Sequence, residues 1–238
     1  LVLAISLLIS VFSVMNGFDK EMRERILSLV PHITVYSHLP IAQWQDPAAA
    51  IAAHPAVLEV SPFTHFDGLL MRGADIETTR GIGLDIEDSA VLERMLASLG
   101  GEAIARFRGQ PDALILGVGL ADKLNIVVGD QLNIIVPGSG LDDSLSAARF
   151  ATVRLSATLD TGTELDQVAA LVHMELASRV AGLDGAVSGL RVTTRDIFSV
   201  QSVAWELLQE LPPGYYTTNW MMTHGNLYAA IQLSRDLV

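Results

Sequence analysis

Histidine is the side chain best suited to metal or acid–base chemistry in this sequence, because the chain contains no cysteine. The six histidines include no pair four residues apart and no His-Glu signature, the spacing that would put two zinc ligands on one helix face. The lack of cysteine also excludes a disulfide scaffold and a thiol nucleophile. We therefore expect no metal, no cofactor and no catalytic residue.

Two glycine-rich segments have part of a phosphate-binding pattern. Gly117-Val118-Gly119 precedes a predicted helical turn, but a third glycine is absent and the crossover is too short for a dinucleotide-binding unit. Pro137-Gly138-Ser139-Gly140 has neither the lysine nor the following helix of a P-loop. We interpret the first as a tight strand-to-helix turn and the second as a flexible loop.

The acidic side chains lie in polar stretches and do not form a spaced catalytic pair. Asp85, Glu87 and Asp88 form one group and Asp142-Asp143 another, and both are typical of a solvated face. With 27 acidic and 15 basic residues the chain has a net charge of -12, which disfavours nucleic acid as a partner. The composition, 50% hydrophobic and 18% charged, excludes a disordered chain.

The first thirty residues change from wholly apolar to amphipathic. Residues 1–15 carry no charge, and as a helix they would cover only about 22 Å. A signal-peptide core and a buried helix are alternatives, but there is no basic region before this stretch and no breaker after it until Pro31. We expect residues 1–30 to be the end of a first transmembrane helix and its amphipathic extension.

The last residues resemble the beginning of a second span. Asn226 can cap a helix whose apolar stripe includes Leu227, Tyr228 and Ile231. A short core helix is the alternative, but Tyr228 would suit the aromatic belt of a membrane interface. We expect residues 226–238 to start a second transmembrane helix.

Between these ends the pattern predicts an α+β fold. A strand, helix and strand are expected at residues 33–36, 42–53 and 57–71, and again at 189–194, 197–211 and 215–221. We assign residues 31–79 and 186–225 to one split βαβ/βαβ subdomain. Residues 80–185 form an inserted β-rich subdomain, with strands expected at 113–116, 131–136, 150–159 and 168–174.

Several short motifs resemble those of a known family, the lipoprotein-releasing ABC transporter permeases of the LolC/LolE type. The most specific is SVMNGFDKEM at residues 13–22, at the junction of the first helix and the following domain. Further agreement lies in VSPF at 60–63, FDGL at 66–69, GLADKL at 119–124, VGD at 128–130, VP at 136–137 and VSG at 187–189.

This resemblance implies a MacB-like periplasmic domain, with a porter-like α/β subdomain and an inserted sabre subdomain. It implies a bacterial inner-membrane permease, not an enzyme, that works with a second permease and an ATPase dimer. Such a transporter extracts lipoproteins from the inner membrane and passes them to a periplasmic chaperone. A sensory ectodomain and a MacB-type efflux or export permease are the alternatives.

The resemblance also implies where lipoprotein acyl chains would be contacted. The expected contact residues lie at the two membrane boundaries and are Val14, Met15, Phe18, Leu227, Tyr228 and Ile231. In the chaperone-recruiting permease a proline-framed hook follows the strand that matches residues 131–136. Here the corresponding loop, Pro137–Ala148, is short and acidic, which favours the LolE-like branch.

Overall fold

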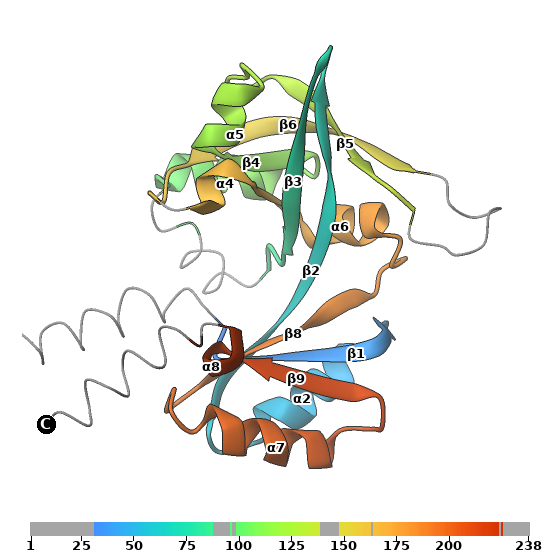
Figure 1. The fold of residues 1–238 in the computed structure, drawn as a ribbon, viewed down its shortest axis with the longest axis vertical. Coiled ribbons are helices and arrows are strands. Elements are labelled where there is room, and N and C mark those ends of the chain that lie inside the picture. Colours follow the sequence, from blue (N-terminus) through green and yellow to red (C-terminus); the bar gives the residue numbers. More distant parts are fainter. Residues whose placement is uncertain are drawn as a thin grey trace, which may run out of the picture. The chain divides into compact units, whose positions relative to one another are not determined.

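The fold is that of a computed structural model, which describes residues 31–87, 96, 99–138, 148–162, 164–223 and 225. It contains strands and helices in mixed order along the chain (Figure 1). The elements are β1 (Ile33–Ile41), α2 (Gln45–Ala52), β2 (Val57–Arg72), β3 (Asp75–Leu84), α4 (Gly101–Gly109), β4 (Ala113–Gly117), α5 (Val118–Lys123), β5 (Gln131–Val136), β6 (Arg149–Leu159), the 3-10 turn η1 (Glu164–Gln167), β7 (Ala169–His173), α6 (Met174–Ala181), β8 (Val187–Thr194), α7 (Val200–Glu210), β9 (Tyr215–Asn219) and α8 (Trp220–Thr223).

The chain divides into two compact units. Of the described residues, 31–35, 50–60 and 191–223 belong to unit 1, and 36–49 together with those between 61 and 190 belong to unit 2. The predicted insertion at 80–185 is thus narrower than unit 2. The difference arises because β2 and β3 form one antiparallel hairpin, with Arg72 opposite Asp75 and Thr64 opposite Gly83, and a boundary at residue 80 would cut through it.

Two βαβ segments, each of which includes residues of unit 1, are interleaved. Their hydrogen-bonded strands follow the order β2-β8-β1-β9, so strands from β1-α2-β2 alternate with strands from β8-α7-β9. This is the split βαβ arrangement, and it confirms the predicted α+β fold class. Helix α7 packs against β9 and buries Val200, Val203 and Leu207, which recur at helical spacing.

Two prolines after α7 and the buried Trp220 fix the segment from α7 to α8 in unit 1. Helix α7 stops at Leu211 because Pro212 and Pro213 cannot continue it, and Gly214 turns the chain with a φ of +104°. Trp220 is fully buried, and its indole N–H donates to the carbonyl of Ile197 over 2.6 Å. These contacts hold α8 against β9, whereas the sequence pattern had extended the strand to residue 221.

Unit 2 contains a closed ring of six strands. The order is β3-β7-β4-β6-β5-β2, and the additional pairing of β3 with β2 joins the two ends. The ring mixes parallel pairs, β3 with β7 and β4 with β6, with antiparallel ones. Closure removes the open edges that would otherwise expose unpaired backbone groups.

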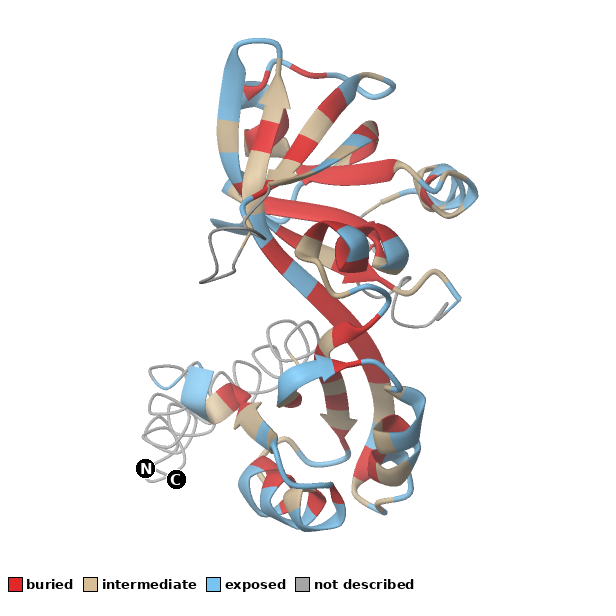
Figure 2. Cartoon of the chain, turned by 90° about the vertical axis from the view of Figure 1, so that its right-hand side faces the viewer, coloured by how far each residue is buried: buried red, intermediate tan, exposed pale blue. Residues whose placement is uncertain are grey.

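Two hydrophobic clusters lie on opposite faces of these strands. Leu114 and Leu116 of β4 belong to one cluster, which α5 and α6 help to enclose, while Ala113 and Ile115 belong to the other, which includes Phe107 of α4. The alternation follows from the two-residue period of a strand. Buried segments therefore run along both strands and helices (Figure 2).

The sequence pattern missed two elements of unit 2. Strand β3 is polar and carries Gly81 and Gly83, and helix α4 begins and ends with glycine and buries Phe107 alone. The other predicted strands of the insertion are present within a few residues. No helix of the described residues is long and apolar enough to cross a membrane. The expected membrane segments, residues 1–30 and 226–238, lie outside the described residues.

Gly117 lies where β4 turns into α5, and it is pressed against the chain at Asp166. A Cβ on Gly117 would be 2.4 Å from the carbonyl oxygen of Asp166. Because that oxygen belongs to the backbone, it cannot move aside as a flexible side chain would. We expect Gly117→Ala to lower the free energy of unfolding by about 1–3 kcal/mol, measured by urea denaturation.

Gly100→Ala is the matched control. Gly100 is also an N-cap residue, of α4, and its φ and ψ of -68° and 154° are close to the -57° and 140° of Gly117. No atom of the residues that the structure describes lies within 4 Å of the Cβ that Gly100 would gain. The free energy of unfolding of the Gly100→Ala variant should stay the same or rise by up to about 1 kcal/mol. Equal effects of the two substitutions would contradict the close approach of Gly117 to Asp166.

Candidate functional site

The six residues predicted to contact acyl chains, Val14, Met15, Phe18, Leu227, Tyr228 and Ile231, all lie outside the described residues. The structure therefore does not test whether they come together, and their role stays a prediction. Among the described residues, the candidate sites are hollows on the two units.

The histidines of the described residues take part in structural contacts. In unit 1, His32 Nδ1 accepts the backbone N–H of Thr194 at 3.0 Å, and His54 lies 2.9 Å from Glu206. In unit 2, the ring of His173 lies 4.7 Å from that of Phe107 in an edge-to-face contact. Within the described part of the chain no three His, Asp or Glu side chains are grouped as metal ligands.

The glycine motif at 117–119 serves packing. The Cβ that Gly117 lacks would meet the backbone of Asp166, and the one that Gly119 lacks would meet the amide of Gln167 at 2.0 Å. Both glycines thus let η1 lie directly on the turn from β4 to α5, whose contacts include η1. The space in front of this turn is filled by protein, which agrees with its interpretation as a tight strand-to-helix turn.

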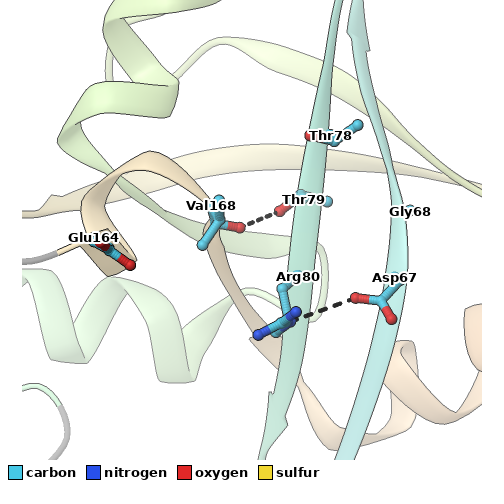
Figure 3. A pocket seen from close by; sticks show the side chains of 7 residues that line it. All are labelled: Asp67, Gly68, Thr78, Thr79, Arg80, Glu164 and Val168. Carbon is cyan, nitrogen blue, oxygen red and sulfur yellow. Dashed lines mark hydrogen bonds and ion pairs between the residues drawn. The ribbon is translucent and has the colours of Figure 1, made fainter.

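A polar hollow lies on unit 2 beside the hairpin of β2 and β3 (Figure 3). Its volume is about 450 Å³, and it is open to solvent. The lining residues come from β2, β3 and the η1 segment and are Asp67, Gly68, Thr78, Thr79, Arg80, Glu164 and Val168.

Backbone pairing fixes one wall of this polar hollow. The Val168 carbonyl accepts the hydroxyl of Thr79 at 2.9 Å and the backbone N–H of Arg80 at 2.8 Å. The Arg80 side chain reaches across to Asp67, with Nε 3.6 Å from Oδ1, and both side chains are largely exposed. An exposed pair at this distance contributes little to stability, so both groups are available to a polar partner.

The loop that carries Glu164 is held by one buried carboxylate. Asp166 Oδ1 accepts the backbone N–H and the hydroxyl of Thr161 at 2.9 and 2.8 Å, and Oδ2 accepts the N–H of Gly162 at 2.8 Å. Asp166 as a residue is only 6% exposed. This carboxylate therefore orders the turn that forms the second wall of the polar hollow.

A second hollow of unit 2, of about 390 Å³, lies between the end of β3, the end of α4 and the start of α6. It brings Asp85 and Glu87 to Arg108, Glu175 and Arg179. The Nε and Nη2 atoms of Arg108 are buried and have no hydrogen-bond partner among the described residues. From the sequence, Asp85 and Glu87 were expected on a solvated face, and Glu87 is exposed. Only the fold brings these two residues into one hollow with Arg108 and Arg179.

The described residues present surfaces for contact, and neither hollow of unit 2 assembles a nucleophile, a base and an orienting group. Fold and site together define an α+β domain of interleaved βαβ segments and a six-stranded ring, with polar hollows on its surface. Residues 1–210 match the family model described as the MacB-like periplasmic core domain, and the chain belongs to this family.

Relatives cover nearly the whole chain. The lipoprotein-releasing system transmembrane protein LolE of Haemophilus influenzae is 26% identical over 99% of this chain and 58% of its own length. LolC proteins of Xylella fastidiosa and Neisseria meningitidis are each 27% identical over 99% of this chain and 57% and 58% of their own lengths. The chain thus spans less than two thirds of the length of these relatives. The matches confirm the resemblance to the LolC/LolE type.

A solved structure supports the fold. The periplasmic region of MacB from Actinobacillus actinomycetemcomitans aligns with a TM-score of 0.50 over 87% of this chain and 98% of that one, at 12% identity. At this identity the likeness concerns the fold alone.

Asp166→Asn tests whether the carboxylate shapes the polar hollow. The amide nitrogen would face an N–H donor at Thr161 or Gly162 and leave it without an acceptor. We expect the free energy of unfolding to fall by about 1–3 kcal/mol. Glu164→Gln, an exposed change in the same loop, is the control and should be neutral. Equal denaturation midpoints for the two variants would exclude the ordering role of Asp166.

Proposed function

We propose that this chain is the periplasmic domain, with the ends of its two flanking membrane helices, of a permease in a bacterial lipoprotein-releasing ABC transporter. One observation carries the proposal: proteins named as lipoprotein-releasing system transmembrane proteins align with 99% of the chain. The permease would be located in the inner membrane and would have this domain in the periplasm.

In this proposal the work of the domain is mechanical. A separate ATPase dimer hydrolyses ATP, and its closure moves the membrane helices of this permease and of a second one. The amphipathic stretch around Phe18–Leu29 passes that movement to the domain. Unit 2 suits such a role because a closed ring with two filled cores resists deformation. The lipoprotein then passes to a periplasmic chaperone.

We further propose that the chain is of the LolE-like branch. Identities of 26% to a LolE protein and 27% to LolC proteins do not separate the two branches. The loop at Pro137–Ala148 is the feature that supports the LolE-like assignment. That loop is short, contains Asp142-Asp143 and has no second proline to frame a hook. Residues 139–147 lie outside the described residues.

A MacB-type efflux or export permease is the second candidate function, and the shared fold with a MacB periplasmic region favours it over a sensor. The two permease functions differ in cargo. The test is reconstitution of the full-length permease with its partner subunits in proteoliposomes that contain a triacylated lipoprotein. ATP-dependent transfer of that lipoprotein to the soluble chaperone is expected, and its absence in an assembled, ATP-hydrolysing complex would refute the proposed function.

In the same assay Met15→Asp and Phe18→Asp should abolish lipoprotein release. Both residues lie where the first helix changes from apolar to amphipathic, and a charge at such a boundary costs about 2–3 kcal/mol. Phe18→Leu keeps an apolar side chain and should retain release. Circular dichroism should show the same fold for all variants. A photo-crosslinker at Met15 that captures only bulk lipid or the neighbouring permease would contradict acyl contact.

The chaperone should bind the isolated domain weakly or not at all. A hook holds its partner by inserting an apolar protrusion into a cavity, and the acidic loop at 137–148 contains few large apolar residues. Calorimetric titration of the chaperone into the domain provides the measurement. Binding at micromolar concentration or tighter would assign the chain to the chaperone-recruiting branch instead.

A further inference from the structure

In unit 1, helices α7 and α8 both pack against strand β9 (Figure 1), and residues of these three elements line a hollow. Its volume is about 280 Å³. The lining residues are Gln201, Ala204, Trp205, Leu208, Thr217, Asn219, Met221 and Met222. We call it the Trp205 hollow, and none of its lining residues among those that the structure describes is charged, although the chain as a whole carries a net charge of -12.

Large apolar side chains in the Trp205 hollow are open to solvent. Trp205 is 67% exposed and Met222 is 70% exposed. Both line the same depression, so they form one patch and are not scattered surface positions. A patch of this kind indicates contact with an apolar or interfacial partner.

Charges on α7 lie on the other side of the helix. Gln201, Trp205 and Leu208 recur at helical spacing and share one stripe. At about 100° per residue, Glu206 and Glu210 fall on a face turned away from that stripe. Glu206 is also held by His54, at 2.9 Å. An approaching partner would therefore meet the Trp205 hollow without a facing carboxylate from α7.

The position of the Trp205 hollow along the chain indicates what would cover it. Met222 precedes Asn226, where the second membrane helix is proposed to begin, by four residues. Four residues of extended chain span at most about 14 Å, so Met222 cannot be far from the membrane boundary. Tryptophan is the side chain that most prefers the interfacial layer of a bilayer, where an apolar ring and a polar N–H are both accommodated.

We propose that the Trp205 hollow docks onto the interfacial layer of the bilayer, at the face where the second membrane helix begins. This inference rests on the proposed function, because it requires that helix. The contact would be uncharged, which lets an acidic domain approach lipid headgroups without electrostatic repulsion at the point of contact. Docking would fix unit 1 against the membrane beside the start of the second membrane helix.

The test uses the full-length permease, assembled with its partner subunits in phosphatidylcholine nanodiscs. Residues 1–238 contain no cysteine, so Met222→Cys provides a unique labelling position once cysteines elsewhere are replaced by serine. An environment-sensitive fluorophore at this position should shift to shorter wavelength and lose most of its emission when the lipid carries a spin label near the headgroup. Adding Trp205→Asp should restore that emission.

Glu210→Cys, on the opposite face of the same helix, is the matched control. Its label should keep its emission with spin-labelled lipid and be quenched by iodide in solution. If only iodide quenches the label at position 222, the proposal is overturned. If neither iodide nor the spin-labelled lipid quenches it, the proposal is also overturned, and the Trp205 hollow is covered by protein instead. Lipoprotein release by the same nanodisc sample is scored separately, so a failed docking and a failed function are distinguished.

Discussion

The architecture of unit 2 depends on the Phe66 ring lying over Gly81. These two residues are directly opposite in the ladder of β2 and β3, and a Cβ at Gly81 would lie 2.0 Å from the ring. Without that space the ring could not turn into the core, and β3 could not pair with β2 and β7 at once. The polar hollow uses the next rungs, Asp67 with Arg80, so the contact that fills the core also positions the surface.

The dependence of β3 on its partner strands also explains which elements could not be predicted from the sequence. Glycine has a low preference for strands, and β3 combines two glycines with polar residues, so its strand character comes from partners on β2 and β7. Helix α4 was missed for a related reason, because its one buried residue, Phe107, gives no periodic apolar stripe. Strands β4 and β7 were predictable as short runs of buried, mostly apolar residues. Strand β5 and helix α7 were predictable because their buried residues follow the period of a strand and of a helix.

The surfaces were less predictable than the elements. The polar hollow joins residues 67–80 to residues 164–168, and only the parallel pairing of β3 with β7 brings them together. The role of Asp166 had a local signal, because a carboxylate a few residues after Thr161-Gly162 can cap that turn. The contact of Asp166 with Gly117 had no local signal in the sequence, since it joins segments about fifty residues apart.

The described residues also constrain where lipid could be held. Each methylene of an acyl chain gains about 0.8 kcal/mol when it leaves water for an apolar site, so a binding site needs an unfilled apolar space. The two hydrophobic clusters of unit 2 are filled by their own side chains, with Leu114, Leu116 and Ile115 fully buried. The polar hollow carries an arginine and two carboxylates, which an acyl chain would have to desolvate. Within the part of the chain that the structure describes, unit 2 is therefore suited to polar contacts and to rigidity.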